Sequence, residues 1–180
     1  MAMAQTIPDM KAAAKSLRRP REPLAKPLPC AVGPRILLAD DDISVRASLQ
    51  DVLVEEGYQV IPAHDGQHAL ELIAATAFDL VLLDLNMPRK NGWETFERLS
   101  AKHPLVPVIL ITGRPNQLFT AVGAGVGSLL EKPLDIPHLL ATLRRLLAES
   151  SEVRLRRLVG REATFHYRPA PAGSSPYHVR

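Results

Sequence analysis

Residues 79–85 read DLVLLDL, a run that is apolar on both faces and is bounded by acidic residues. A run of this kind is typical of a strand buried between two layers of helices. Runs of similar length recur on either side of it. They are RILLA at 35–39, YQVIPA at 58–63, VPVILIT at 106–112 and SLLEK at 128–132. The sequence therefore predicts five strands.

Segments with helical periodicity separate these strands. The first reads SVRASLQDVLVEEGY at 44–58, where Ser44 can cap the helix and Gly57 can end it. The others are GQHALELIAAT at 66–76, GWETFERLSAKH at 92–103, the weaker PNQLFTAVGAG at 115–125 and IPHLLATLRRLLAE at 136–149. Strands that alternate with helices predict an α/β fold with right-handed crossovers. We expect a flavodoxin-like (βα)5 doubly wound parallel sheet with strand order 2-1-3-4-5.

The two ends of the chain differ in composition from this core. Residues 1–34 hold six basic and two acidic side chains and six of the 16 prolines, so we expect a basic, disordered lead. Residues 150–180 also hold six basic and two acidic side chains. They could extend the last helix as far as Gly160, and the remainder is expected to be disordered. The single domain is therefore predicted at 35–149, where 15 acidic groups outnumber 10 basic ones.

Composition excludes several classes of protein. The hydrophobic fraction of 46% is too high for a wholly disordered chain. No window approaches the roughly 18 consecutive apolar residues of a membrane span, and the N-terminal stretch has no apolar core of a secretory signal. Cys30 is the only cysteine, so neither an internal disulfide nor a thiolate metal site is expected. We expect a cytoplasmic protein that does not bind membranes.

Chemically active side chains follow the predicted strands at their carboxyl ends, where open parallel sheets bind ligands. Several carboxylates would converge there if strands one and three are neighbours, and Mg²⁺ suits such oxygen ligands. A lysine and a threonine on the other flank can balance and hydrogen-bond a transferred phosphoryl group. A carboxylate that ends its strand facing this cluster can become an aspartyl-phosphate. The residues are Asp40–Asp42, Asp84, Asn86, Thr112 and Lys132.

Each of these residues also has an ordinary structural explanation. The aspartate triplet can form a turn and a helix cap, and Asp84 can form a turn before a proline loop. Thr112 can be a plain strand residue, and Lys132 can be a solvated charge. Their joint position at the ends of four strands favours a functional site.

Four motifs match a known family. They are ILLADDD at 36–42, LVLLDLNMPRKNG at 80–92, VILITG at 108–113 and LLEKP at 129–133. With nearly normal spacings over about residues 35–148, the chain resembles the receiver domain of two-component response regulators. The resemblance implies that Asp84 is the phosphoacceptor and that Lys132 and Thr112 bind the phosphoryl group, Thr112 as the switch hydroxyl.

The resemblance also implies a Mg²⁺ site. Asp41 and Asp84 match direct ligands, and Asp40 matches a residue that acts through water. Asn86 matches the position whose backbone carbonyl completes the site. The Lys132-Pro133 bond is often cis in this family. One position departs from the pattern, because Leu129 stands where the family usually has a tyrosine or phenylalanine that reports phosphorylation.

Three functions compete. The first is a single-domain response regulator that receives a phosphoryl group on Asp84 from a histidine kinase or phosphotransfer protein. It would signal by protein contact, with a phosphorylation-dependent homodimer as one outcome, and its only catalysis would be self-phosphorylation and autodephosphorylation. The second is a transcription regulator acting through the basic tail, although RLRRLVGREATFHYRP at 154–169 offers only one short helix, so DNA binding is not expected. The third is a degenerate receiver that serves as a scaffold, which the complete residue set argues against.

Overall fold

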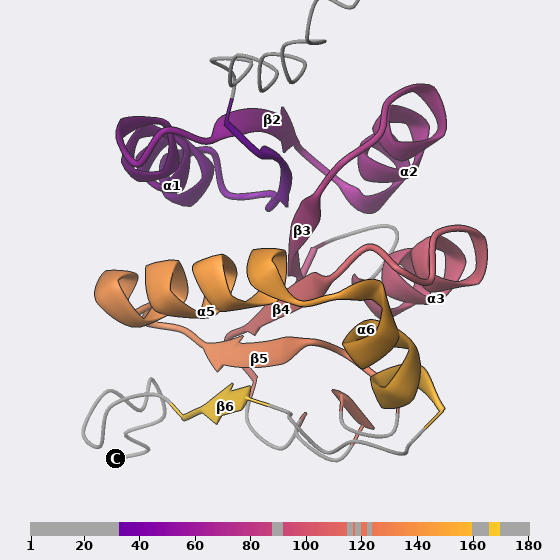
Figure 1. The fold of residues 1–180 in the computed structure, drawn as a ribbon. Coiled ribbons are helices and arrows are strands. Elements are labelled where there is room, and N and C mark those ends of the chain that lie inside the picture. The colour runs from indigo at the N-terminus through magenta and orange to yellow at the C-terminus, as the bar shows by residue number, and fades with distance from the viewer. Residues whose placement is uncertain are drawn as a thin grey trace, which may run out of the picture. The chain divides into compact units, whose positions relative to one another are not determined.

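The computed structural model describes residues 33–87, 92–114, 117, 120–121, 124–159 and 166–169. They contain one parallel sheet with the order β2-β1-β3-β4-β5-β6 (Figure 1). Its strands are β1 Arg35–Ala39, β2 Gln59–Ala63, β3 Leu80–Asp84, β4 Val108–Thr112, β5 Ser128–Glu131 and β6 His166–Arg168. The predicted five-strand order 2-1-3-4-5 is confirmed, and a sixth strand extends it.

Helices cover both faces of this sheet. They are α1 Ile43–Glu55, α2 Gly66–Ala75, α3 Gly92–Lys102, α5 Ile136–Ala148 and α6 Ser151–Leu158. Figure 1 shows α1 and α5 on one face and α2 and α3 on the other. Each face has its own apolar core, one containing Leu53 and Leu143 and the other containing Phe96 and Leu129. The predicted doubly wound architecture is therefore confirmed.

Several predicted parts of the chain lie mostly outside the described residues. They are the predicted lead at 1–34, the loop at 88–91, the predicted helix at 115–125 and the predicted tail at 160–180. Gln117 is described, and its side chain accepts a hydrogen bond of 3.0 Å from the indole Nε1 of Trp93 on α3. Trp93 also packs edge-on against Phe96, with ring centroids 5.9 Å apart. Across the described part of the chain, no helix is long and apolar enough to cross a bilayer.

The first helix begins one residue earlier than expected. Asp42, rather than Ser44, is the N-cap, and its Oδ1 accepts hydrogen bonds from the backbone N–H groups of Ser44 at 2.8 Å and Val45 at 3.2 Å. An aspartate directly before the first helical residue satisfies N–H groups that have no partner within the helix. Gly57, with φ of +88°, follows the helix in the left-handed conformation that glycine adopts most readily. The helix thus starts directly after the strand-end aspartates.

The C-terminal residues differ from the predicted basic tail. Helix α5 stops at Ala148, and α6 is a separate helix capped by Ser150, whose Oγ accepts a hydrogen bond from Val153 N at 3.3 Å. The possible extension of the last helix toward Gly160 is thus a separate helix that ends at Leu158. Beyond Gly160 the structure describes only residues 166–169, where His166–Arg168 pair with β5 in parallel. The outer edge of β5 offers N–H and C=O groups that a further strand can satisfy, which explains how so short a strand can pair there.

Candidate functional site

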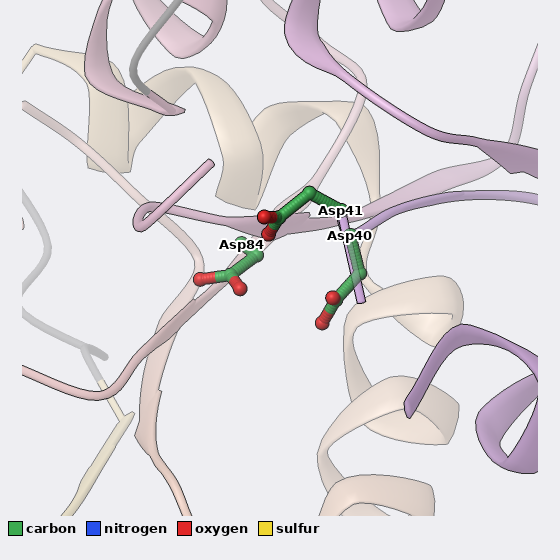
Figure 2. A group of neighbouring side chains, drawn as sticks. All are labelled: Asp40, Asp41 and Asp84. Carbon is green, nitrogen blue, oxygen red and sulfur yellow. The ribbon is translucent and has the colours of Figure 1, made fainter. Parts of the chain in front are cut away.

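Three carboxylates meet at the carboxyl ends of β1 and β3. Figure 2 shows Asp40 and Asp41 from the end of β1 beside Asp84 from the end of β3. One oxygen of each carboxylate lies within 4.8 Å of those of the other two. These strands are direct neighbours, with Ala39 opposite Leu83, so the predicted convergence follows from the strand order. Asp40 and Asp84 are buried, whereas Asp41 is exposed and leaves the cluster open to solvent.

Lys132 brings the balancing charge. It directly follows β5, and its Nζ donates hydrogen bonds to Asp84 Oδ2 at 2.7 Å and to Asp40 Oδ2 at 3.0 Å. Its backbone N–H donates to the carbonyl of Thr112 at 2.8 Å, which joins the ends of β4 and β5. The Lys132-Pro133 bond is cis, as the resemblance implies. A single ammonium group thus lies between two buried carboxylates from different strands.

Burial and charge act against each other in this cluster. Burial raises the pKa of the Asp40 carboxyl, and the hydrogen bond and charge of Lys132 only partly offset that effect. Burial also acts to lower the pKa of the Lys132 ammonium, but its hydrogen bonds to Asp84 and Asp40 outweigh burial and raise it. Lys132 therefore stays positively charged near neutral pH. The cluster as a whole is anionic, and its cation is the ammonium group of Lys132.

Backbone hydrogen bonds orient both buried carboxylates. Asp84 Oδ1 accepts from the N–H of Asn86 at 2.9 Å, and Asp40 Oδ1 accepts from the N–H of Asp42 at 2.9 Å. Each carboxylate therefore has one oxygen held by the backbone and the other held by Lys132. A guanidinium N–H of Arg46 adds a hydrogen bond of 2.6 Å to the carbonyl of Asp40. Arg46 is a site residue that the sequence does not reveal, because no motif indicates that its side chain reaches back across the first turn of α1.

Thr112 and Leu129 lie on the strands behind this cluster. Thr112 is buried at the end of β4, and its Oγ1 accepts a hydrogen bond from the N–H of Arg114 at 2.9 Å. The predicted switch hydroxyl is therefore at the expected edge of the sheet, but it is bonded to its own turn. Leu129 is fully buried in the core that contains Phe96. The carbonyl role expected for Asn86 stays a prediction.

The third aspartate of the triplet has a role distinct from the other two. Asp42 caps α1, and hydrogen bonds from the N–H groups of Val45 and Ser44 lower the pKa of its carboxyl. We expect Asp42→Ala to lower the melting temperature by a few degrees. A lowered pKa gives stability that is present above the unfolded value of about 3.8 and is lost as the pH falls through the folded value. The gap in stability between wild type and variant should therefore close in acid below about pH 3.8, which thermal unfolding across pH would measure.

Comparison with known proteins identifies the family. Residues 36–144 match the family model of the response regulator receiver domain. The chain belongs to this family. A receiver domain is a phosphoacceptor module rather than a classical enzyme, and it implies a cognate histidine kinase. The acidic cluster of this receiver domain is of the kind that binds Mg²⁺.

The curated relatives match part of this chain. The transcriptional regulatory protein CpxR of Escherichia coli K12 is 41% identical over 118 residues, which are 64% of this chain and 50% of CpxR. The response regulator MprA of Mycobacterium avium is 39% identical over 115 residues, which are 63% of this chain and 50% of MprA. The chain therefore spans about half the length of these curated relatives.

Solved structures of receiver domains also resemble this chain. A CheY-like receiver domain protein from Methanospirillum hungatei JF-1 is 30% identical with a TM-score of 0.63, covering 67% of this chain and 97% of that one. TrrA from Thermotoga maritima, solved in complex with Mg²⁺ and BeF, is 28% identical with a TM-score of 0.59 and covers 63% of this chain and 98% of its own.

Proposed function

We propose that this receiver domain accepts a phosphoryl group on Asp84 from the phosphohistidine of a histidine kinase or phosphotransfer protein, uses Mg²⁺, and signals by protein contact. The observation that carries the proposal is the position of Lys132, which bonds Asp84 and Asp40 at once. The ammonium can move to a phosphoryl group on Asp84 and offset the charge of that group, while Asp40 stays beside the ammonium. A purely structural lysine would have no need of two buried carboxylates from separate strands.

The transfer needs little covalent work from the protein. One carboxylate oxygen of Asp84 attacks phosphorus, the P–N bond to the donor imidazole breaks, and the imidazole leaves with the bonding electron pair. Lys132 then binds the phosphoryl oxygens. The hydroxyl of Thr112 breaks its hydrogen bond with Arg114 and donates a hydrogen bond to one of the phosphoryl oxygens. Attack of water on phosphorus later releases inorganic phosphate and returns the Asp84 carboxylate. Both steps are self-catalysed chemistry on this chain.

The residues at the site fit a Mg²⁺ ion. Carboxylate oxygens from Asp40, Asp41 and Asp84 lie within reach of one centre, and oxygen ligands are those Mg²⁺ prefers. We assign direct ligation to Asp41 and Asp84, ligation through water to Asp40, and the remaining protein ligand to the Asn86 carbonyl. When bound, the ion would neutralise charge on the transferring phosphoryl group. The Mg²⁺ and BeF named for the TrrA structure support Mg²⁺ as the metal.

Mass spectrometry tests the proposal directly. The full chain is incubated with a small phosphodonor and Mg²⁺, and the labelled residue is identified after reductive trapping of the acyl phosphate. We expect one phosphoryl group, on Asp84, and no label when a chelator removes the metal. Label on any other residue, or label that persists in excess chelator, would contradict the mechanism.

Direct DNA binding is the weaker alternative for the output. CpxR is named a transcriptional regulatory protein, but this chain spans half of it. On α6 the arginines are engaged within the chain, since Arg154 donates to the carbonyls of Leu105 and Leu146 and Arg157 pairs with Glu149. Arginines held in this way are not free to contact phosphates. Output through a protein partner or a second copy of the chain therefore remains our proposal.

A further inference from the structure

The α6–β6 extension holds β5 along its length. Strand β6 pairs with β5 in parallel, with Ser128 opposite His166 and Leu130 opposite Arg168 (Figure 1). Without β6, the structure would end at β5, whose backbone groups on that side would lack a partner in the sheet. Because Pro169 has no N–H, the pairing cannot continue toward Lys132. The extension thus covers the strand that ends at the phosphoryl site.

Helix α6 holds the segment that leads into β5. A methyl group on Gly127 would lie 3.1 Å from the Arg157 guanidinium, and one on Gly125 would lie 3.3 Å from Leu158, so the helix packs closely on both glycines. Arg157 is buried and forms an ion pair with Glu149, which follows α5. Arg154 donates at 3.0 Å to the carbonyl of Leu105, ahead of β4. The contacts of α6 therefore depend on where residues 124–127 lie.

The segment at 124–127 connects to the site through β5. It leads directly into that strand, and Lys132 directly follows the strand. If Lys132 turns to a phosphoryl group, motion of Lys132 and of β5 would disturb the packing of α6 on the glycines. Strand β6 is only three residues long, so it belongs to the parts of a fold that open most easily.

We infer that the α6–β6 extension is an autoinhibitory latch, which pairs with β5 while Asp84 is unphosphorylated and is released when the site takes up a phosphoryl group. This inference rests on the proposed function of Asp84. By thermodynamic linkage, if the phosphoryl group weakens the latch, then loss of the latch must tighten binding of a phosphoryl group. Release would expose the β5 edge to another extended segment.

Two proline variants of the full chain test the latch and serve as controls for each other. Successive backbone N–H groups of a strand point in opposite directions, so either His166 or Tyr167, but not both, donates toward β5. Of His166→Pro and Tyr167→Pro, one should remove a hydrogen bond to β5, and the other should place the proline toward solvent, where edge strands tolerate it. We expect one variant to speed amide exchange within residues 128–131 by about tenfold or more, with β1 and β3 unchanged.

The same variants measure the coupling. With Mg²⁺ and beryllofluoride as the probe, the disrupting variant should bind beryllofluoride at least about fivefold more tightly than wild type, and the other should match wild type. In the wild type, beryllofluoride should speed exchange in residues 166–168. If beryllofluoride binds all three proteins equally and leaves exchange in 166–168 unchanged, the latch is wrong and the proposed function stands. If Asp84 takes no label from a phosphodonor, the proposed function fails, and the latch fails with it.

Discussion

Asp84→Asn is expected to abolish phosphoryl labelling completely while the protein keeps its fold. Asparagine has the shape of aspartate but lacks the nucleophilic carboxylate, so no acyl phosphate can form. The charge of Asp84 is one of the causes that raise the pKa of Asp40. Removing one anion from three carboxylates that face one ammonium relieves this repulsion, so the free energy of unfolding should be retained or increase. Phosphodonor labelling followed by mass spectrometry, together with thermal unfolding, measures both effects.

The matched control for this variant is Asp51→Asn. Asp51 is an exposed aspartate on α1, away from the strand ends, so the same chemical change there should leave labelling at the wild-type level. Label that survives in Asp84→Asn would show that another residue is the acceptor. A large loss of stability in Asp84→Asn would instead show that the Lys132 pair holds the fold together more than its position suggests.

Gly92→Ala should damage both stability and labelling, because Gly92 packs directly against the main chain of Asp84, the proposed phosphoacceptor. A methyl group there would overlap with the Asp84 carbonyl oxygen and would lie 2.5 Å from the Leu85 Cα, which is also too close. Since the backbone must move to relieve the overlap, we expect a loss of about 3 kcal/mol in the free energy of unfolding. A displacement near 1 Å at Asp84 would also slow labelling by about 100-fold.

Gly57→Ala separates this overlap from the general effect of replacing a glycine. A methyl group on Gly57 would meet nothing within 4 Å, but φ there is +88°. That conformation should cost about 1 kcal/mol for alanine, with no effect on labelling at the distant strand ends. Equilibrium denaturation and labelling rates of both variants give the comparison. Equal losses in the two variants would mean that the close contact at Asp84 is relieved at little cost.

The sheet and the acidic cluster could be predicted because they depend on strand-length patterns. Residues 80–84 are buried throughout, as a strand covered on both faces must be, and the carboxyl ends of such parallel strands lie at one edge of the sheet. The sequence pattern therefore predicts Asp84 and Lys132 at one edge, where the structure has them. The division of labour within Asp40–Asp42 could not be predicted, because three identical letters do not show which carboxylate turns inward and which caps α1.

The C-terminal extension shows a different limit. Strand β6 is three residues long, so it is too short to show the alternation of apolar and polar residues that indicates a strand. Its position depends instead on pairing with the edge of β5. Helix α6 shares its apolar spacing with α5, and only the extended backbone at Glu149 and Ser150 separates the two helices. These features come from tertiary contacts that local sequence does not contain.

Trp93 is the only tryptophan in the chain, and its indole joins helix α3 to the side chain of Gln117. The two partners belong to segments that follow different strands, one after Asp84 at the end of β3 and one after Thr112 at the end of β4. Indole emission depends on the polarity and hydrogen bonding around the ring, so the intensity and wavelength of fluorescence report on this single contact. The protein therefore carries its own optical probe of the spacing between those segments, and a stopped-flow trace could follow it without any added dye.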